Sequence, residues 1–267
     1  MNPIDEALRA GHAGRPAARA ARPTVVVAGG GGTLGAEVLE QLLASRAFAH
    51  VRVLVTQAFS ATVQGLEPLP FEGLDSIETG SSAPAVADLA LVVFDRERHA
   101  NGRDAAFLRP LPDELPALAG WLCLHGVRDL VVVLPHGAAM LPQALKAGLA
   151  NLDEHAVAAL GFDHVVFVRP AQAPASGTGA GLQRLADLVL AQLRLMTPQQ
   201  LQPVRAKKVA GLVVALAQQL SGSAPGTRVL APELVWQAAQ RTDPETLVHA
   251  WLAGAALPEA DVTVPRM

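Results

Sequence analysis

Residues 25–35 read Val-Val-Val-Ala-Gly-Gly-Gly-Gly-Thr-Leu-Gly, and this stretch decides how the chain folds. The first four residues form an apolar, mostly β-branched run that is typical of a strand buried on both faces. Residues 34–43 continue with apolar side chains at helical spacing. The stretch therefore predicts a strand, a glycine turn and a helix in direct succession, which is the first unit of an α/β domain.

Three glycines of the turn have the spacing of a dinucleotide-binding turn. Gly29 permits a tight turn, Gly32 lets the backbone approach a pyrophosphate, and Gly35 lets the helix pack closely on the strand. The start of the helix adds free N–H groups and a positive dipole potential, which favour a bound phosphate. We predict a dinucleotide site, with a glycine-rich turn that binds nothing as the alternative. The predicted cofactor contacts are Gly29, Gly32, Thr33, Leu34 and Gly35, with Thr56, Phe94 and Asp95 at the ends of two later strands.

Short apolar runs alternate with helical segments along most of the chain. Strands are expected at about 24–28, 51–56, 89–94, 130–134 and 164–168, and helices at about 33–45, 112–125, 143–160 and 178–195. A helix at 207–220, a short strand at 227–230 and a helix at 232–240 follow. The interval from 57 to 88 carries three prolines and has room for one short strand. This alternation predicts an α/β fold with a doubly wound parallel sheet covered by helices on both faces.

The expected organisation is one large domain with two irregular ends. Residues 1–22 are rich in Ala, Gly, Arg and Pro and show no apolar period, so we expect a mobile N-terminal arm. Residues 23–243 form a single Rossmann-like domain, since no interior linker divides them. Residues 244–267 are expected to form a small C-terminal extension, made of a helix and a tail.

Composition excludes several classes of protein. The net charge of −3 provides no general basic surface for nucleic acid, and the hydrophobic fraction of 51% is sufficient for a large core. No apolar run reaches the ~18 residues of a membrane-spanning helix, and the first 22 residues contain no signal-peptide core. We therefore expect a cytoplasmic protein that contacts neither nucleic acid nor membrane. The single cysteine, Cys123, excludes an intrachain disulfide, and the histidine spacing predicts no metal site.

Four features together resemble the atypical short-chain dehydrogenase/reductases: the glycine turn, the strand 131–134, the helix around 146–160 and the sequence Val-Arg-Pro at 168–170. Within that family the chain is most similar to the NAD(P)H-binding branch that contains the Tat-interacting-protein-like and NmrA-like proteins. The resemblance covers residues 24–240 and implies a Rossmann-like sheet with NADP(H) or NAD(H) lying over the strand ends. Residues 56–57 are Thr-Gln, without the acidic residue that binds a ribose hydroxyl or the arginine that binds a 2′-phosphate. The preference between NAD and NADP is therefore undetermined.

The chain departs from that family at the catalytic positions. Active members use a serine or threonine after the fifth strand and a Tyr-x-x-x-Lys pair on the next helix, where the tyrosine transfers the proton. This chain has no tyrosine, and residues 134–137 after the fifth strand read Leu-Pro-His-Gly, without a hydroxyl. In one alignment Lys146 stands at the tyrosine position; in another it matches the lysine, with Pro142 in place of the tyrosine. Either alignment removes the usual proton donor.

The remaining catalytic candidates lie mainly at strand ends, where doubly wound sheets bind ligands. His136 is a candidate general acid with Asp95 orienting it, and Lys146 is a second candidate. The simpler interpretation makes His136 a polar loop residue and Asp95 part of a solvated turn. Arg169 also follows a strand, whereas Asp-Glu-His at 153–155 is expected on a surface face, because adjacent helical side chains point in different directions.

Three functional hypotheses follow. The first is an NAD(P)(H)-binding protein without standard reductase activity, which serves as a sensor, scaffold or regulatory subunit. The second is an NAD(P)H-dependent oxidoreductase in which His136, Lys146 or a water molecule supplies the proton. The third is an interaction module whose glycine turn holds no nucleotide. The expected partner is a dinucleotide, and a protein partner or a homo-oligomer is left open.

Overall fold

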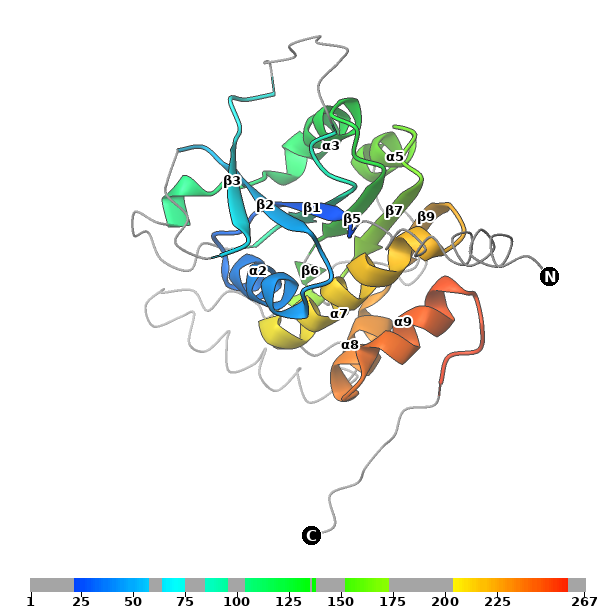
Figure 1. Cartoon of the computed structure of the whole chain (residues 1–267). Helices are drawn as coiled ribbons and strands as arrows, with labels where there is room; N and C mark the ends of the chain where they lie inside the picture. The colour runs from blue at the N-terminus through cyan, green and yellow to red at the C-terminus, as the bar shows by residue number, and fades with distance from the viewer. Residues whose placement is uncertain are drawn as a thin grey trace, which may run out of the picture.

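The computed structural model describes residues 22–57, 64–74, 85–95, 104–134, 136–137, 152–172 and 204–258. Within them, seven parallel strands form one sheet with helices on both faces (Figure 1). The chain runs outward from the first strand to the third and then returns to the other side of the first, which is the order of a Rossmann fold. The predicted doubly wound parallel sheet is confirmed. In sheet order, the strands are β3 (Leu66–Pro70), β2 (His50–Val55), β1 (Thr24–Ala28), β4 (Leu89–Val93), β5 (Asp129–Val133), β7 (His164–Val168) and β9 (Gly226–Leu230).

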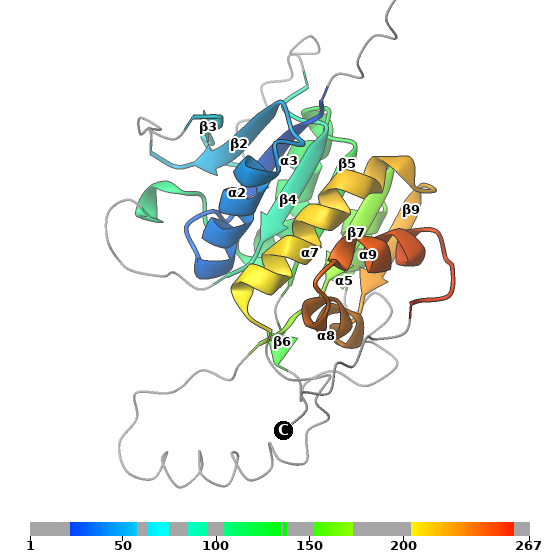
Figure 2. The same cartoon turned by 60° about the horizontal axis from the view of Figure 1, so that its bottom comes forward.

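Two layers of helices cover the sheet. One face carries α2 (Thr33–Ser45) and α7 (Ala206–Gln219), with α8 (Pro232–Gln240) and α9 (Pro244–Leu252) packed against α7 (Figure 2). The other face carries α3 (Leu115–Leu124) and α5 (Leu152–Ala158). The remaining described elements are three short 3-10 turns, η1 (Asp104–Ala106), η2 (Pro112–Glu114) and η4 (Leu220–Gly222), and a separate pair of two-residue strands, β6 (His136–Gly137) and β8 (Ala171–Gln172).

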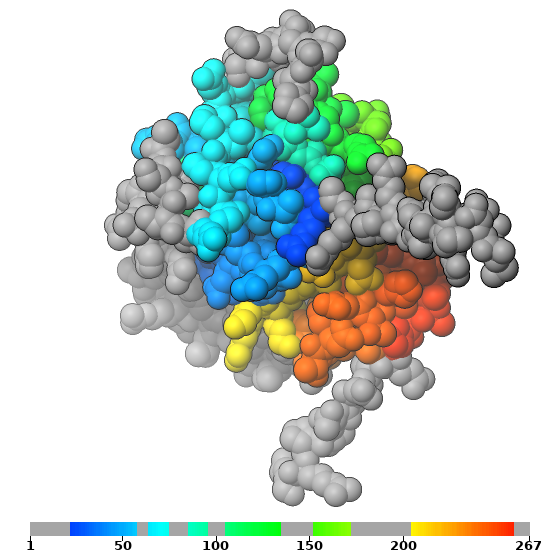
Figure 3. Space-filling view, viewed as in Figure 1, coloured from blue at the N-terminus to red at the C-terminus, as the bar shows by residue number. Residues whose placement is uncertain are grey.

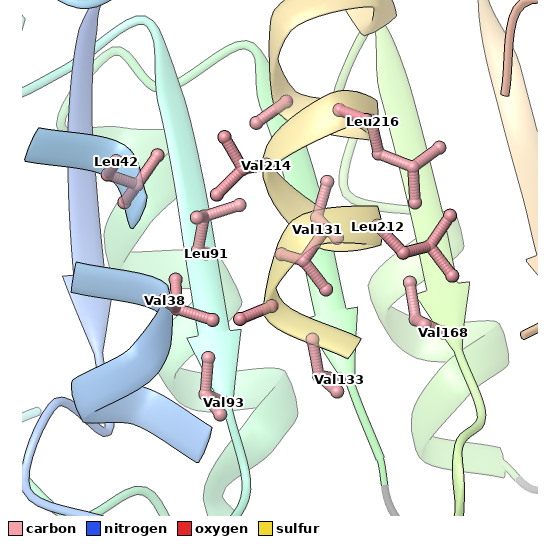
Figure 4. Packing of buried hydrophobic residues seen from close by; sticks show 14 of the residues in the cluster. Val38, Leu42, Leu91, Val93, Val131, Val133, Val168, Leu212, Val214 and Leu216 are labelled. Atoms are coloured by element: carbon pink, nitrogen blue, oxygen red, sulfur yellow. The ribbon is translucent and has the colours of Figure 1, made fainter. Parts of the chain in front are cut away.

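Alternate side chains of the central strands point into opposite halves of the core. In β1, Val25 and Val27 belong to the half that contains α2 and α7, whereas Val26 and Ala28 belong to the half that contains α3. Figure 4 shows the first half, where side chains of β4, β5 and β7 meet those of α2 and α7. Because both faces of these strands are buried, their sequences are continuous apolar runs without a polar alternation.

The edge strand β3 is the short strand expected between residues 57 and 88. It includes Pro68 and Pro70, which pair in register with Val53 and Val55 of β2. Proline lacks a backbone N–H and is tolerated where no further strand must be paired, as at the edge of this sheet. The helix expected at 178–195 lies outside the described residues.

The segment after residue 243 contributes to the core. Leu247 and Val248 of α9 are fully buried in the half of the core that contains α7. In the space-filling view, α8 and α9, in orange and red, lie against α7, in yellow, which separates them from the blue N-terminal βα unit (Figure 3). The helix predicted there is present, and its apolar face is part of the main domain.

A buried, hydrogen-bonded pair of side chains lies at the amino ends of β5 and β7, opposite the glycine turn. The ring Nδ1 of His164 lies 2.7 Å from Oδ1 of Asp129, and its Nε2 lies 3.1 Å from the carbonyl oxygen of Ser223. The two side-chain partners are 5% and 8% exposed. A buried carboxylate is tolerated only when it is paired, so this contact is structural.

We predict that His164→Ala destabilises the fold by about 3–5 kcal/mol, because it leaves the buried Asp129 carboxylate without its ring partner. Urea unfolding measures the effect. The exposed His249 of α9 provides the matched control, and His249→Ala is expected to change stability by less than about 0.5 kcal/mol. Equal stability of the two variants would contradict the structural role of the pair.

Candidate functional site

A pocket opens at the carboxyl ends of β1 and β4, where the strand order reverses. Its volume is about 290 Å³, and its walls are the glycine turn, Thr56 after β2, Val93 and Asp95 at the end of β4, and the segment 105–110. Open α/β sheets bind their ligands at this reversal, beyond the carboxyl ends of the strands. The sequence prediction placed the site at this edge, and the structure forms a pocket there.

Two glycines of the turn are required by the packing of α2 on the sheet. Gly29 has φ +92°, in the left-handed region, and a Cβ on it would lie 2.0 Å from the carbonyl oxygen of Val93. A Cβ on Gly35 would lie 1.9 Å from the carbonyl oxygen of Gly29. Neither position has room for a side chain. The roles that the sequence predicts for them, a tight turn and close helix packing, are those that the geometry shows.

Gly32 is a glycine for a different reason. It is the N-cap of α2, with extended backbone (φ −82°, ψ 174°) that any residue adopts. A Cβ on it would lie 2.6 Å from Oδ2, 2.7 Å from Cβ and 2.8 Å from Cγ of Asp95. The space above Gly32, where the sequence predicts a pyrophosphate, therefore contains the side chain of Asp95.

The carboxylate of Asp95 caps α2. Its Oδ2 accepts a hydrogen bond from the backbone N–H of Leu34, in the first turn of the helix. Gly32 has no side chain to cap the helix, and the first turn contains no acidic residue. The exposed backbone N–H groups and the positive end of a helix attract an anion. Asp95, which follows the neighbouring strand β4, supplies this anion as its carboxylate. The predicted solvated turn is thus wrong for Asp95.

A different helix shows the more usual arrangement. Asp243 is the N-cap of α9, and its carboxylate accepts hydrogen bonds from the backbone N–H of Glu245 (2.9 Å) and the hydroxyl of Thr246 (2.6 Å). The hydrogen bond from Thr246, followed by that from Glu245, lowers the pKa of Asp243. The cap of α9 thus comes from the adjacent residue, whereas that of α2 comes from 61 residues further along the chain.

The segment 104–110 lies across the ends of β1 and β2. Three backbone hydrogen bonds hold it there. The N–H of Gly29 donates to the carbonyl oxygen of Leu108 (3.0 Å), and the N–H of Leu108 donates to that of Leu54 (2.9 Å). The N–H of Thr56 donates to the carbonyl oxygen of Ala106 (2.8 Å). Phe107 forms an antiparallel bridge with Val55. The sequence of this segment predicts no regular structure, because its contacts are backbone hydrogen bonds to distant residues. It brings Arg109 to the wall of the pocket.

The other predicted cofactor residues differ in what they present to the pocket. Thr56 is exposed and lines it. Leu34 is buried and contributes its backbone N–H, which Asp95 occupies. The side chain of Phe94 is buried in the half of the core that contains α3, so only its backbone is near the strand end. Thr33 is exposed at the first position of α2.

Two of the catalytic candidates cannot be placed relative to the pocket. The backbone of His136 lies in β6, which pairs with β8 beyond the ends of β5 and β7. Its side chain lies outside the described residues, as does the whole of Lys146. Their participation in catalysis stays a prediction. Asp95, the third candidate, is the cap of α2.

Arg169, which also follows a strand, is not available to a ligand. Its side chain is 2% exposed, and its guanidinium donates to Oε2 of Glu154 at 2.6 Å. Glu154 lies on α5 and is itself buried, so the surface position expected for it is wrong. The buried arginine and glutamate satisfy each other's charge, which makes the pair part of the domain interior.

A larger hollow of about 600 Å³ lies elsewhere, between α2, α7 and residues 238–245. It touches neither the glycine turn nor a strand end. Among the residues that the structure describes, no three potential metal ligands lie together, and no helix is long and apolar enough to cross a bilayer. The pocket at the glycine turn is therefore the candidate site.

The strand order and the glycine turn define the class: this is a Rossmann-fold α/β protein, the fold that the resemblance to the atypical short-chain dehydrogenase/reductases implies. No family model and no curated protein matches the chain. Among similar solved structures, a Rossmann-fold NAD(P)-binding family protein from Shigella flexneri shows 15% identity and a TM-score of 0.45, over 78% of this chain and 92% of that chain. Bordetella bronchiseptica WbmH, in complex with NAD+, shows 14% identity and a TM-score of 0.41, over 81% of this chain and 80% of that chain. WbmF from the same organism, in complex with NADH, shows 13% identity and a TM-score of 0.41, over 94% of this chain and 84% of that chain.

We predict that Gly35→Ala destabilises the protein by about 1–3 kcal/mol or more, because the added methyl group overlaps the carbonyl of Gly29. Gly120→Ala is the control, since Gly120 lies in α3 with nothing within 4 Å of its Cβ position. That change is expected to be neutral or to stabilise the protein by about 0.5–1 kcal/mol. Thermal unfolding compares the two, and a Gly35→Ala protein as stable as Gly120→Ala would rule out the close contact.

Proposed function

We propose that the chain binds a nicotinamide dinucleotide at the glycine turn and does not carry out the standard reductase reaction of its fold. The observation that carries this proposal is the position of the pocket, at the reversal of strand order and against the glycine turn. Its volume of about 290 Å³ is near the lower limit of ligand pockets, roughly 300 Å³. A pocket of this size accommodates part of a dinucleotide, with the remainder over the strand ends.

The residues present fit the ligand in part. Gly29 and Gly35 give the turn its close approach, and Arg109 brings the single positive charge among the described residues that line the pocket. The carboxylate of Asp95 does not fit, because it occupies the N–H of Leu34 and the space above Gly32 that a pyrophosphate requires. Binding of the dinucleotide therefore requires that this side chain move.

The proposed role is that of a sensor, scaffold or regulatory subunit. Standard reduction of a carbonyl ends with proton transfer to an alkoxide, and the family to which the chain is similar uses tyrosine for this step. The chain has no tyrosine and no hydroxyl at residues 134–137. A protein that binds the dinucleotide without this donor is suited to report its presence to a partner. An oxidoreductase that draws its proton from His136, Lys146 or water is the alternative.

The contact of Asp95 favours a second candidate function, an interaction module without nucleotide. In this case the carboxylate is a permanent cap of α2, and the hydrogen bonds of segment 104–110 to β1 and β2 permanently cover the strand ends. The first candidate function requires binding of a nicotinamide dinucleotide and the second excludes it, so a titration with the dinucleotide separates them.

We predict that the purified chain binds NADH or NADPH in a calorimetric titration, and that Gly32→Val abolishes binding, because a side chain at this position projects into the space for the pyrophosphate. Gly222→Val is the control, since the Cβ position of Gly222 has nothing within 4 Å. Far-UV circular dichroism checks that both variants are folded. Absence of binding to the wild type would favour the interaction module, and equal affinity of wild type and Gly32→Val would place the ligand elsewhere.

We further predict that the chain oxidises NADPH with aldehydes, ketones or quinones about 10² to 10⁴ times more slowly than enzymes with a positioned acid, since general acid catalysis contributes that factor. The measurement follows NADPH absorbance with a panel of these substrates. His136→Ala is tested in parallel. Rapid turnover that disappears in this variant would establish the oxidoreductase, with His136 as its acid.

A further inference from the structure

We propose that Asp95 is an internal competitor for the phosphate position of the glycine turn, so that a phosphate-bearing ligand binds only when the carboxylate leaves the N–H of Leu34. The inference rests on the proposed function for the identity of its ligand. It assigns to Asp95 a part in selecting ligands, in place of the catalytic part that the sequence suggests.

The carboxylate stands where a ligand phosphate would bind. It accepts the hydrogen bond of Leu34 in the first turn of α2, a helix of 13 residues with no cap of its own. In Rossmann folds the corresponding helix start binds the pyrophosphate through its backbone N–H groups and dipole. A carboxylate and a phosphate both accept hydrogen bonds through anionic oxygens. The backbone N–H of Leu34 can donate to only one of them at a time.

Both anions cannot occupy the turn together. Three atoms of the Asp95 side chain lie within 2.6–2.8 Å of the Cβ position of Gly32, so the side chain fills the space that this glycine leaves open. A phosphate that reached Leu34 past this side chain would also meet its negative charge at short range, in a partly buried position where screening by water is weak. Binding of a phosphate and departure of Asp95 are therefore the same event.

Asp95 directly follows a backbone segment that is fixed in the sheet. Phe94, the preceding residue, donates its backbone N–H to the carbonyl of Val133 at 3.0 Å and buries its side chain in the core. The carbonyl of Val93 lies against the Cα of Gly29. The backbone up to Phe94 is thus fixed, so the turn is cleared by a rotation of the Asp95 side chain and not by a shift of β4. The apparent dissociation constant then equals the intrinsic one divided by the fraction of molecules in which the carboxylate is away.

The test compares four proteins by calorimetric titration with NADH and, separately, with adenosine, which has no phosphate. The proteins are wild type, Asp95→Ala, Asp95→Asn and Glu40→Gln. Asp95→Asn keeps an oxygen that accepts the Leu34 hydrogen bond and so preserves the fold if Asp95→Ala does not. Glu40 is exposed on the same helix, and its change removes one carboxylate without touching the turn.

We expect NADH affinity to rise about ten- to a hundred-fold in Asp95→Ala, the ratio that corresponds to losing a charge-assisted hydrogen bond of the competitor. Asp95→Asn is expected to give a smaller rise, and Glu40→Gln none. Adenosine affinity is expected to be the same in all four proteins. A rise limited to Asp95→Ala and Asp95→Asn, and to NADH, supports the inference.

The other outcomes separate the inference from the proposed function. If wild type binds NADH and both Asp95 variants bind it equally or more weakly, the inference is wrong and the proposed function stands. If only the Asp95 variants bind, the inference stands and the wild type is the interaction module. If none binds, both are wrong. A rise that adenosine or Glu40→Gln shares would identify a general opening of the pocket or a charge effect, and would also overturn the inference.

Discussion

The contact between the carbonyl of Gly29 and the Cα of Gly35 determines where α2 begins. Because neither residue has a side chain, the helix starts directly on the end of β1, beside the pocket. Gly32, the N-cap of this helix, has no side chain that could supply a capping oxygen. The end of β4 lies beside the turn, so Asp95 reaches across and supplies the missing acceptor. The start of α2 on the sheet, beside the pocket, therefore depends on one close approach of backbone to backbone.

Most of the fold could be predicted from the sequence, because the physics that determines it is local. Central strands such as β4 and β5 are buried on both faces, and their continuous apolar runs show this directly. The bounds of α2 follow from apolar spacing after a glycine turn. The strand β3 is harder to predict, since its sequence Leu-Glu-Pro-Leu-Pro is acceptable only in an edge strand. Which strand lies at the edge depends on the order of all the strands in the sheet. The burial of α9 is likewise a property of its packing on α7.

Less of the site could be predicted, because its decisive contacts join distant residues. The sequence located the glycine turn at the correct edge of the sheet. It did not foresee that Asp95 caps a helix 61 residues earlier, although a signal existed: α2 has a glycine N-cap and no acidic residue in its first turn, so an acceptor had to come from elsewhere. The burial of Arg169 could not be predicted for a similar reason. Its partner Glu154 lies on a different element, and only the fold shows that both are buried.

The central claim is that Asp95 holds the phosphate position of the turn, and the backbone amide of Leu34 reports it most directly. Its ¹H–¹⁵N resonance, followed by NMR in wild type and in Asp95→Ala without any ligand, measures whether the carboxylate is its acceptor. We predict a large upfield shift of the Leu34 amide proton in the variant, because the amide loses a charged acceptor, while the amide resonances of α9 keep their positions. A Leu34 resonance that is the same in both proteins would contradict it.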